Sequence, residues 1–174
     1  MNVIVLASVL LAAAAADDPV SVKYRVTGLF APEREADLRE ASKKMADAAL
    51  AAVDYANAEV TFTYDPAKMP KNAKPEQIQS QIDNQLRNAS NHTFALKPLS
   101  TVPREKLQKV EITVGCLDCK ACGFGLYNIV MGVPGVEQTF VNYKEGIVTA
   151  WIDPEKTDRA KIVDLLKKRE VRVK

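Results

Sequence analysis

The feature that most constrains the fold of this 174-residue chain is an internal repeat with a constant spacing of 88 residues. Tyr64-Asp65-Pro66-Ala67-Lys68 in the first half matches Ile152-Asp153-Pro154-Glu155-Lys156 in the second. Val60-Thr61 matches Val148-Thr149 at the same spacing. A register that holds at separate places along the chain indicates a duplicated structural unit.

Each half predicts the same order of elements: strand, helix, two strands, helix and strand. β-Branched runs indicate the strands, and apolar residues at helical spacing indicate the helices. In the second half the elements are expected at 110–114, 121–131, 136–143, 146–152, 159–168 and 171–173. In the first half they are expected at 20–27, 33–50, 51–55, 59–64, 75–89 and 93–96. Asp158 is expected to cap the helix that follows it.

This order is that of the ferredoxin-like split βαβ motif. The predicted fold class is therefore α+β, with two tandem ferredoxin-like βαββαβ domains, each a four-stranded antiparallel sheet with two helices. We expect the first domain, here the first unit, at 17–100, a linker at 101–108, and the second domain, here the second unit, at 109–174.

All three cysteines of the chain lie in one heptapeptide, Cys116-Leu117-Asp118-Cys119-Lys120-Ala121-Cys122. Thiolate sulfur is the preferred protein ligand of soft cations such as Cu(I). Cys119 and Cys122 are three residues apart where a helix is expected to begin, so their side chains lie on one helical turn. The unpaired amides and the positive end of the dipole at a helix N-terminus favour the thiolate form. Cys116 is expected to be an auxiliary third ligand.

Other uses of the cysteines remain open. An exported compartment would permit a Cys116–Cys119 or a Cys119–Cys122 disulfide, either inert or active in thiol–disulfide exchange. A cysteine-ligated iron–sulfur cluster requires four cysteines, and this chain has three. Zinc prefers four protein ligands in a structural site, although a carboxylate could complete its coordination.

The second unit resembles the heavy-metal-associated domains of copper chaperones, mercury-binding periplasmic proteins and metal-transporting P-type ATPases. The family pattern is Gly-Met-x-Cys-x-x-Cys, and Cys119-Lys120-Ala121-Cys122 supplies its two cysteines. Leu117 stands where the family has Met, and Cys116 stands where it has Gly. Ile152-Asp153-Pro154 is similar to the family's signature after its third strand. The resemblance implies a metal loop with Cys119 and Cys122 as ligands.

In the 88-residue register the first unit carries Ala31 and Arg34 at the two cysteine positions. The resemblance implies a degenerate copy that keeps the scaffold and lacks the ligands. Arg169, near the end of the last helix, is expected as a residue that faces the metal loop.

The pattern of the N-terminal residues indicates a targeting segment. Residues 3–16 are apolar or small apart from Ser8, and they end in Ala14-Ala15-Ala16. A signal peptide at 1–16 is predicted, with no membrane association after its cleavage. A net charge of +2 gives no bias toward nucleic acid, and a single histidine argues against histidine-based catalysis.

We therefore expect an exported, periplasmic or secreted, non-enzymatic protein that carries or sequesters a soft metal ion. Cu(I) is the first choice, with Hg(II), Zn(II) and Cd(II) as alternatives. The expected partners are the ion and a metal-transporting membrane protein or another dithiol carrier. The alternatives are a thiol–disulfide redox protein and a protein-interaction module with a structural disulfide.

Overall fold

The computed structural model describes residues 18–115 and 119–174, so the predicted signal peptide and Cys116 lie outside the described residues. In the first unit the helices and strands are β1 (Val20–Thr27), α1 (Arg34–Ser42), β2 (Ala48–Asp54), β3 (Glu59–Tyr64), a 3-10 turn η1 (Pro66–Lys68), α2 (Pro75–Ala89) and β4 (Ala95–Lys97). After a second 3-10 turn, η2 (Arg104–Lys106), the second unit contains β5 (Gln108–Thr113), α3 (Lys120–Met131), β6 (Val136–Asn142), β7 (Ile147–Ile152) and α4 (Arg159–Lys168).

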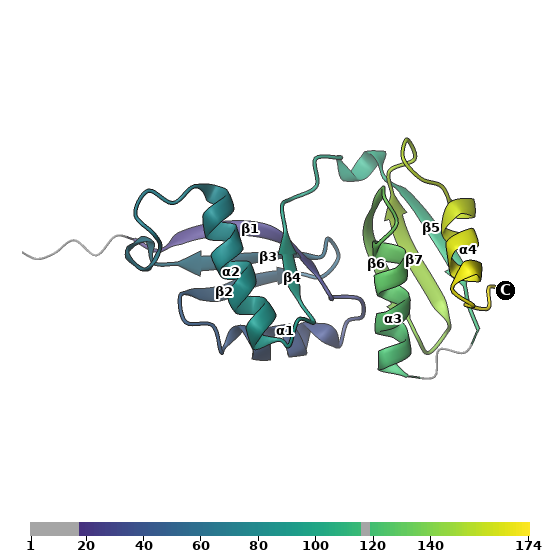
Figure 1. Cartoon of the computed structure of the whole chain (residues 1–174), viewed down its shortest axis with the longest axis horizontal. Helices are drawn as coiled ribbons and strands as arrows, with labels where there is room; N and C mark the ends of the chain where they lie inside the picture. The colour runs from purple at the N-terminus through teal and green to yellow at the C-terminus, as the bar shows by residue number, and fades with distance from the viewer. Residues whose placement is uncertain (1–17, 116–118) are drawn as a thin grey trace, which may run out of the picture.

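The two units have the same order of helices and strands up to the last strand, which confirms the predicted α+β class and the tandem ferredoxin-like arrangement (Figure 1). The first sheet has the order β2-β3-β1-β4 and the second has the order β5-β7-β6, with antiparallel pairing throughout. The expected closing strand at 171–173 contributes only an isolated bridge, between Val173 and Val114. The second sheet therefore has three described strands where four were predicted.

The 88-residue register appears in the structure at the central hairpins. β3 covers residues 59–64 and β7 covers residues 147–152, so both ends differ by 88. The aspartate after each strand makes the same turn: Asp65 accepts a hydrogen bond from Ala67 N at 2.9 Å, and Asp153 accepts one from Glu155 N at 3.1 Å. An aspartate side chain that binds the amide two residues ahead stabilises such a turn. Descent of the two units from a common repeat stays a prediction.

The long helix expected at 33–50 is wrong. α1 ends at Ser42, whose hydroxyl donates to Leu38 O at 2.5 Å, and Ala48 already belongs to β2. Alanine favours a helix by only a few tenths of a kcal/mol per residue, and tertiary context overrides so small a preference. Here Ala48–Asp54 pairs with β3 from end to end, with one register shift between Leu50 and Ala52.

Each unit has its own core between one face of its sheet and its helices. In the first, Leu38, Ile82 and Leu86 from α1 and α2 are fully buried beneath the sheet. In the second, Ile162 and Leu166 from α4 are fully buried, and Asp158 caps that helix as predicted by accepting from Lys161 N at 2.9 Å. Among the described residues, no helix has both the length and the apolar character that a membrane span requires.

Candidate metal centre

Cys119 is the N-cap of α3. Its backbone is extended, with φ −151° and ψ 157°, and its sulfur accepts a hydrogen bond from Cys122 N at 3.2 Å. A cap side chain satisfies one of the amides that the first helical turn leaves unpaired. The cap therefore fixes the Cys119 sulfur against the turn that carries Cys122.

The structure brings Cys119 and Cys122 together on the surface. Both residues are exposed, and the Cys119 sulfur accepts a hydrogen bond from the backbone amide of Cys122. The predicted convergence of two sulfurs at a helix start is present in the geometry. Burial of either thiol, or separation of the two, would have excluded a shared ion.

The thiol chemistry differs from the expectation at Cys122. The hydrogen bond with the Cys119 side chain raises the pKa of Cys122 above its ordinary value, and partial desolvation and the charge of Cys119 act in the same direction. The opposing effect of the backbone amides is smaller. Two neighbouring thiols resist losing both protons, because the second thiolate would face the first. A bound cation removes that repulsion, so metal binding would release the proton.

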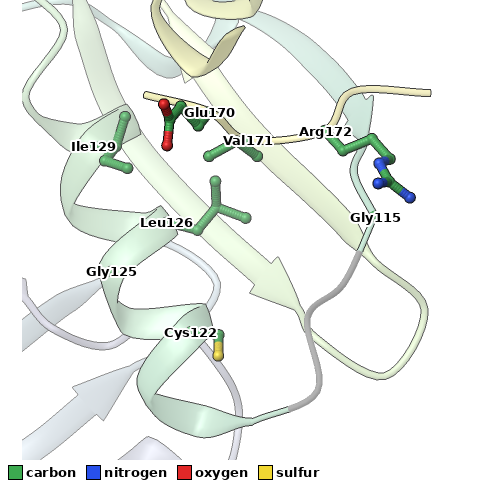
Figure 2. A pocket seen from close by; sticks show the side chains of 8 residues that line it. All are labelled: Gly115, Cys122, Gly125, Leu126, Ile129, Glu170, Val171 and Arg172. Carbon is green, nitrogen blue, oxygen red and sulfur yellow. The ribbon is translucent and has the colours of Figure 1, made fainter. Parts of the chain in front are cut away.

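Cys122 opens into a groove of about 390 Å³ between α3 and the C-terminal segment (Figure 2). Its lining residues are Gly115, Cys122, Gly125, Leu126, Ile129, Glu170, Val171 and Arg172. The C-terminal segment is held beside Gly115, whose backbone N–H donates to Arg172 O at 2.8 Å. Sequence reasoning proposed Arg169 for this region, whereas Arg172 lines the groove and Arg169 is the C-cap residue of α4.

The opposite side of α3 contacts the first unit (Figure 1). Phe30 lies in the loop between β1 and α1, is 2% exposed, and belongs to the hydrophobic core of the second unit. Its ring centroid is 5.7 Å from those of both Phe124 and Tyr127 on α3. Sequence reasoning missed this contact, because no periodic pattern relates Phe30 to a helix nearly a hundred residues further along.

Charged groups of the first unit also reach the start of α3. Glu33 accepts a hydrogen bond from the Tyr143 hydroxyl at 2.6 Å. This bond lowers the pKa of Glu33, and the nearby charges of Lys120 and Lys144 lower it further. Lys120 therefore lies within the electrostatic field of Glu33 while it adjoins Cys119.

The donor set fits a soft ion that accepts few ligands. Across residues 18–115 and 119–174, no group of three or more His, Cys, Asp or Glu side chains could hold a metal ion. Two sulfurs suffice for Cu(I) or Hg(II), whereas structural zinc normally requires four protein ligands. The third candidate ligand, Cys116, lies outside the described residues, so its participation stays a prediction.

No protein-family model matches this chain, and none of the curated proteins is significantly similar to it. Among solved structures, the chain is similar to the oxidised MerP of Ralstonia metallidurans CH34, with 20% identity and a TM-score of 0.37, over 39% of this chain and 94% of that one. It is similar to the "putative copper-ion-binding protein" of Bacillus anthracis str. Ames, with 25% identity and a TM-score of 0.37, over 39% of this chain and 96% of that one. The water-soluble region of the P-type ATPase CopA from Bacillus subtilis matches 90% of this chain and 91% of its own length, with 17% identity and a TM-score of 0.37. Membership of the heavy-metal-associated family stays a prediction.

Proposed function

We propose that this protein binds a soft metal cation, with Cu(I) as the first choice, through Cys119 and Cys122, and that it carries or sequesters the ion without enzymatic chemistry. The observation that carries the proposal is the pairing of two exposed cysteines at the N-terminus of α3, where the Cys119 sulfur accepts a hydrogen bond from Cys122 N. Hg(II) would fit the same donors, and Zn(II) and Cd(II) remain alternatives.

Electrostatics at the start of α3 supports a bis-thiolate complex. Two thiolates and one Cu(I) ion carry a net charge of −1. The positive end of a helix dipole and the unpaired amides of its first turn stabilise a negative charge at that place. Lys120 is exposed and directly follows Cys119, so its ammonium group adds to this stabilisation.

Exposure supports carriage rather than a structural role. An ion held by two surface sulfurs can be attacked by the thiolates of another protein and passed on by stepwise ligand exchange. The partner that fits this chemistry is a protein with its own dithiol, either a metal-transporting membrane protein or a second carrier. The apolar segment at 3–16 supports export to the periplasm or the exterior.

The test is an anaerobic titration of Cu(I) into the reduced protein, in competition with a chromogenic Cu(I) chelator. The wild type is expected to bind one ion per chain, and Cys119→Ser and Cys122→Ser are each expected to lose that binding. His92→Ala is the matched control, because it removes the only histidine and should leave binding unchanged. Cys116→Ser then reports whether a third sulfur contributes.

Two results would contradict the proposal. One is weak, substoichiometric binding that the cysteine substitutions leave unchanged. The other is efficient disulfide exchange with a model substrate by a protein that fails to retain Cu(I), which would favour the thiol–disulfide alternative.

A further inference from the structure

We propose that the β1–α1 loop of the first unit, through Phe30, is a positioning element for the thiol pair of the second unit. This inference rests on the proposed function, since it assigns a role in metal binding to a unit whose own loop has Ala31 and Arg34 in place of cysteines. Phe30 acts through α3 and makes no bond to the ion.

The contact reaches the residue next to a ligand. Gly123 directly follows Cys122 and is buried. A Cβ atom at Gly123 would lie 3.5 Å from Cε2 of Phe30 and 3.6 Å from Cβ of Tyr143. The Phe30 ring and Tyr143 therefore close over the backbone of the first turn of α3.

Residues of both units contact the Phe30 ring. The guanidinium carbon of Arg34 lies 5.5 Å from the centre of the Phe30 ring and 5.2 Å from that of Phe94. Stacking of a cation on an aromatic face is attractive, more so when it is shielded from water. From the second unit, Phe124 and Tyr127 pack against the same ring. The Phe30 ring is therefore packed between the first unit and α3.

Backbone hydrogen bonds fix the same loop to the second unit. Gly28 N donates to the Tyr127 hydroxyl at 2.9 Å, and Val141 N donates to Phe30 O at 2.8 Å. The loop therefore bonds to α3 at Gly28 and to β6 at Phe30 itself, so it resists displacement along the interface.

The order of the first turn of α3 matters for binding because the conformation of this turn sets the positions of both sulfurs. Cys122 is on the turn, and Cys119 is bonded to the turn through Cys122 N. A site that is ordered before the ion arrives loses less conformational entropy on binding. Residues that hold metal ligands in place without binding the metal themselves typically contribute a factor of about 10 to 100 to metal affinity.

The test compares two substitutions at one interface. Phe30→Ala removes the aromatic ring that packs against α3. Tyr55→Ala removes an aromatic contact across the same interface, the tilted packing of Tyr55 on Phe140 with ring centroids 4.7 Å apart, which does not involve α3. Phe30→Leu keeps a buried apolar side chain and serves as the milder variant if Phe30→Ala does not fold, as judged by circular dichroism.

Two measurements are made on each variant. Cu(I) affinity is measured by chelator competition, and backbone order at residues 120–123 is measured by ¹⁵N relaxation of the metal-free protein. We expect Phe30→Ala to retain one ion per chain with about tenfold weaker affinity and lower order parameters at 120–123. Tyr55→Ala should match the wild type in both, and Phe30→Leu should fall between.

Equal affinity and equal order in a folded Phe30 variant would overturn the inference, and so would an equal loss in Tyr55→Ala, which would reflect general loosening of the interface. A wild type that binds no Cu(I) would instead refute the proposed function. The relaxation measurement would then still decide whether Phe30 orders the first turn of α3.

Discussion

Tyr127→Phe is expected to lower the free energy of unfolding by about 2 kcal/mol. The Tyr127 ring is buried in the second unit, and its hydroxyl accepts a buried hydrogen bond from Gly28 N of the first unit at 2.9 Å. The substitution leaves that amide without a partner, and an unsatisfied buried donor costs about 1–3 kcal/mol. The ring stays, so little packing is lost. The assay is urea unfolding at pH 7, followed by circular dichroism.

The control is Tyr143→Phe, which also removes one hydroxyl from the interface. That hydroxyl donates to Glu33 in an exposed position, where water replaces the lost partner, so the unfolding midpoint should hardly change. The reasoning would be refuted if Tyr127→Phe unfolded at the same urea concentration as the wild type and as Tyr143→Phe.

The effect of Tyr127→Phe also depends on pH. Burial raises the pKa of Tyr127 to about 12, against the opposing effects of the Gly28 amide and Arg25. An unfolded tyrosine ionises near pH ~10, so between about pH 10 and 12 the folded state holds the proton that the unfolded state has lost. The wild type therefore loses stability as the pH rises, by up to about 1.4 kcal/mol per pH unit, and the phenylalanine variant escapes this loss. The difference in the free energy of unfolding between the wild type and Tyr127→Phe should therefore shrink above pH ~10.

Two further substitutions test other parts of the structure. Gly28→Ala should lower the free energy of unfolding by more than about 1 kcal/mol in urea denaturation, because Gly28 has φ +90° and an added Cβ would lie 2.2 Å from Thr93 O. Asp153→Asn should remove part of the acid sensitivity of the second unit. The hydrogen bond from Lys156 lowers the pKa of Asp153, so its stabilisation is present above the pKa of the unfolded carboxyl and is lost as the pH falls through the lower folded value. The melting temperatures of the wild type and of Asp153→Asn, measured between about pH 2 and 7, check this. The same dependence of melting temperature on pH in the two proteins would contradict it.

Local patterns in the sequence predicted the elements well where the pattern belonged to one element. The strand expected at 59–64 is β3 with the same bounds, and the helix expected at 159–168 is α4 with the same bounds. The prediction failed where alanine gives little signal, so that Ala48 and Leu50 were assigned to a helix although they pair in β2. Pairing along a neighbouring strand decides such residues, and that pairing is not local.

The candidate site was predicted in part for the same reason. The spacing of Cys119 and Cys122 is local, and it placed the two cysteines at the start of a helix, where Cys119 is the N-cap and Cys122 lies on the first turn. The position of Arg172 beside the groove and the insertion of Phe30 behind α3 depend on segments that meet only in the folded chain. The raised pKa of Cys122 likewise depends on how the two side chains face each other.

The outer strand of the second sheet has a consequence for solubility. β6 lies at the margin of that sheet, where unpaired amides can recruit a strand from another molecule. On this edge strand the Val141 amide already donates a hydrogen bond to the Phe30 carbonyl. The ring of Tyr55 packs against the neighbouring Phe140. The first unit thereby shields the second from intermolecular β-pairing. A fragment lacking residues 18–100 would expose both groups and should self-associate more readily than the full chain.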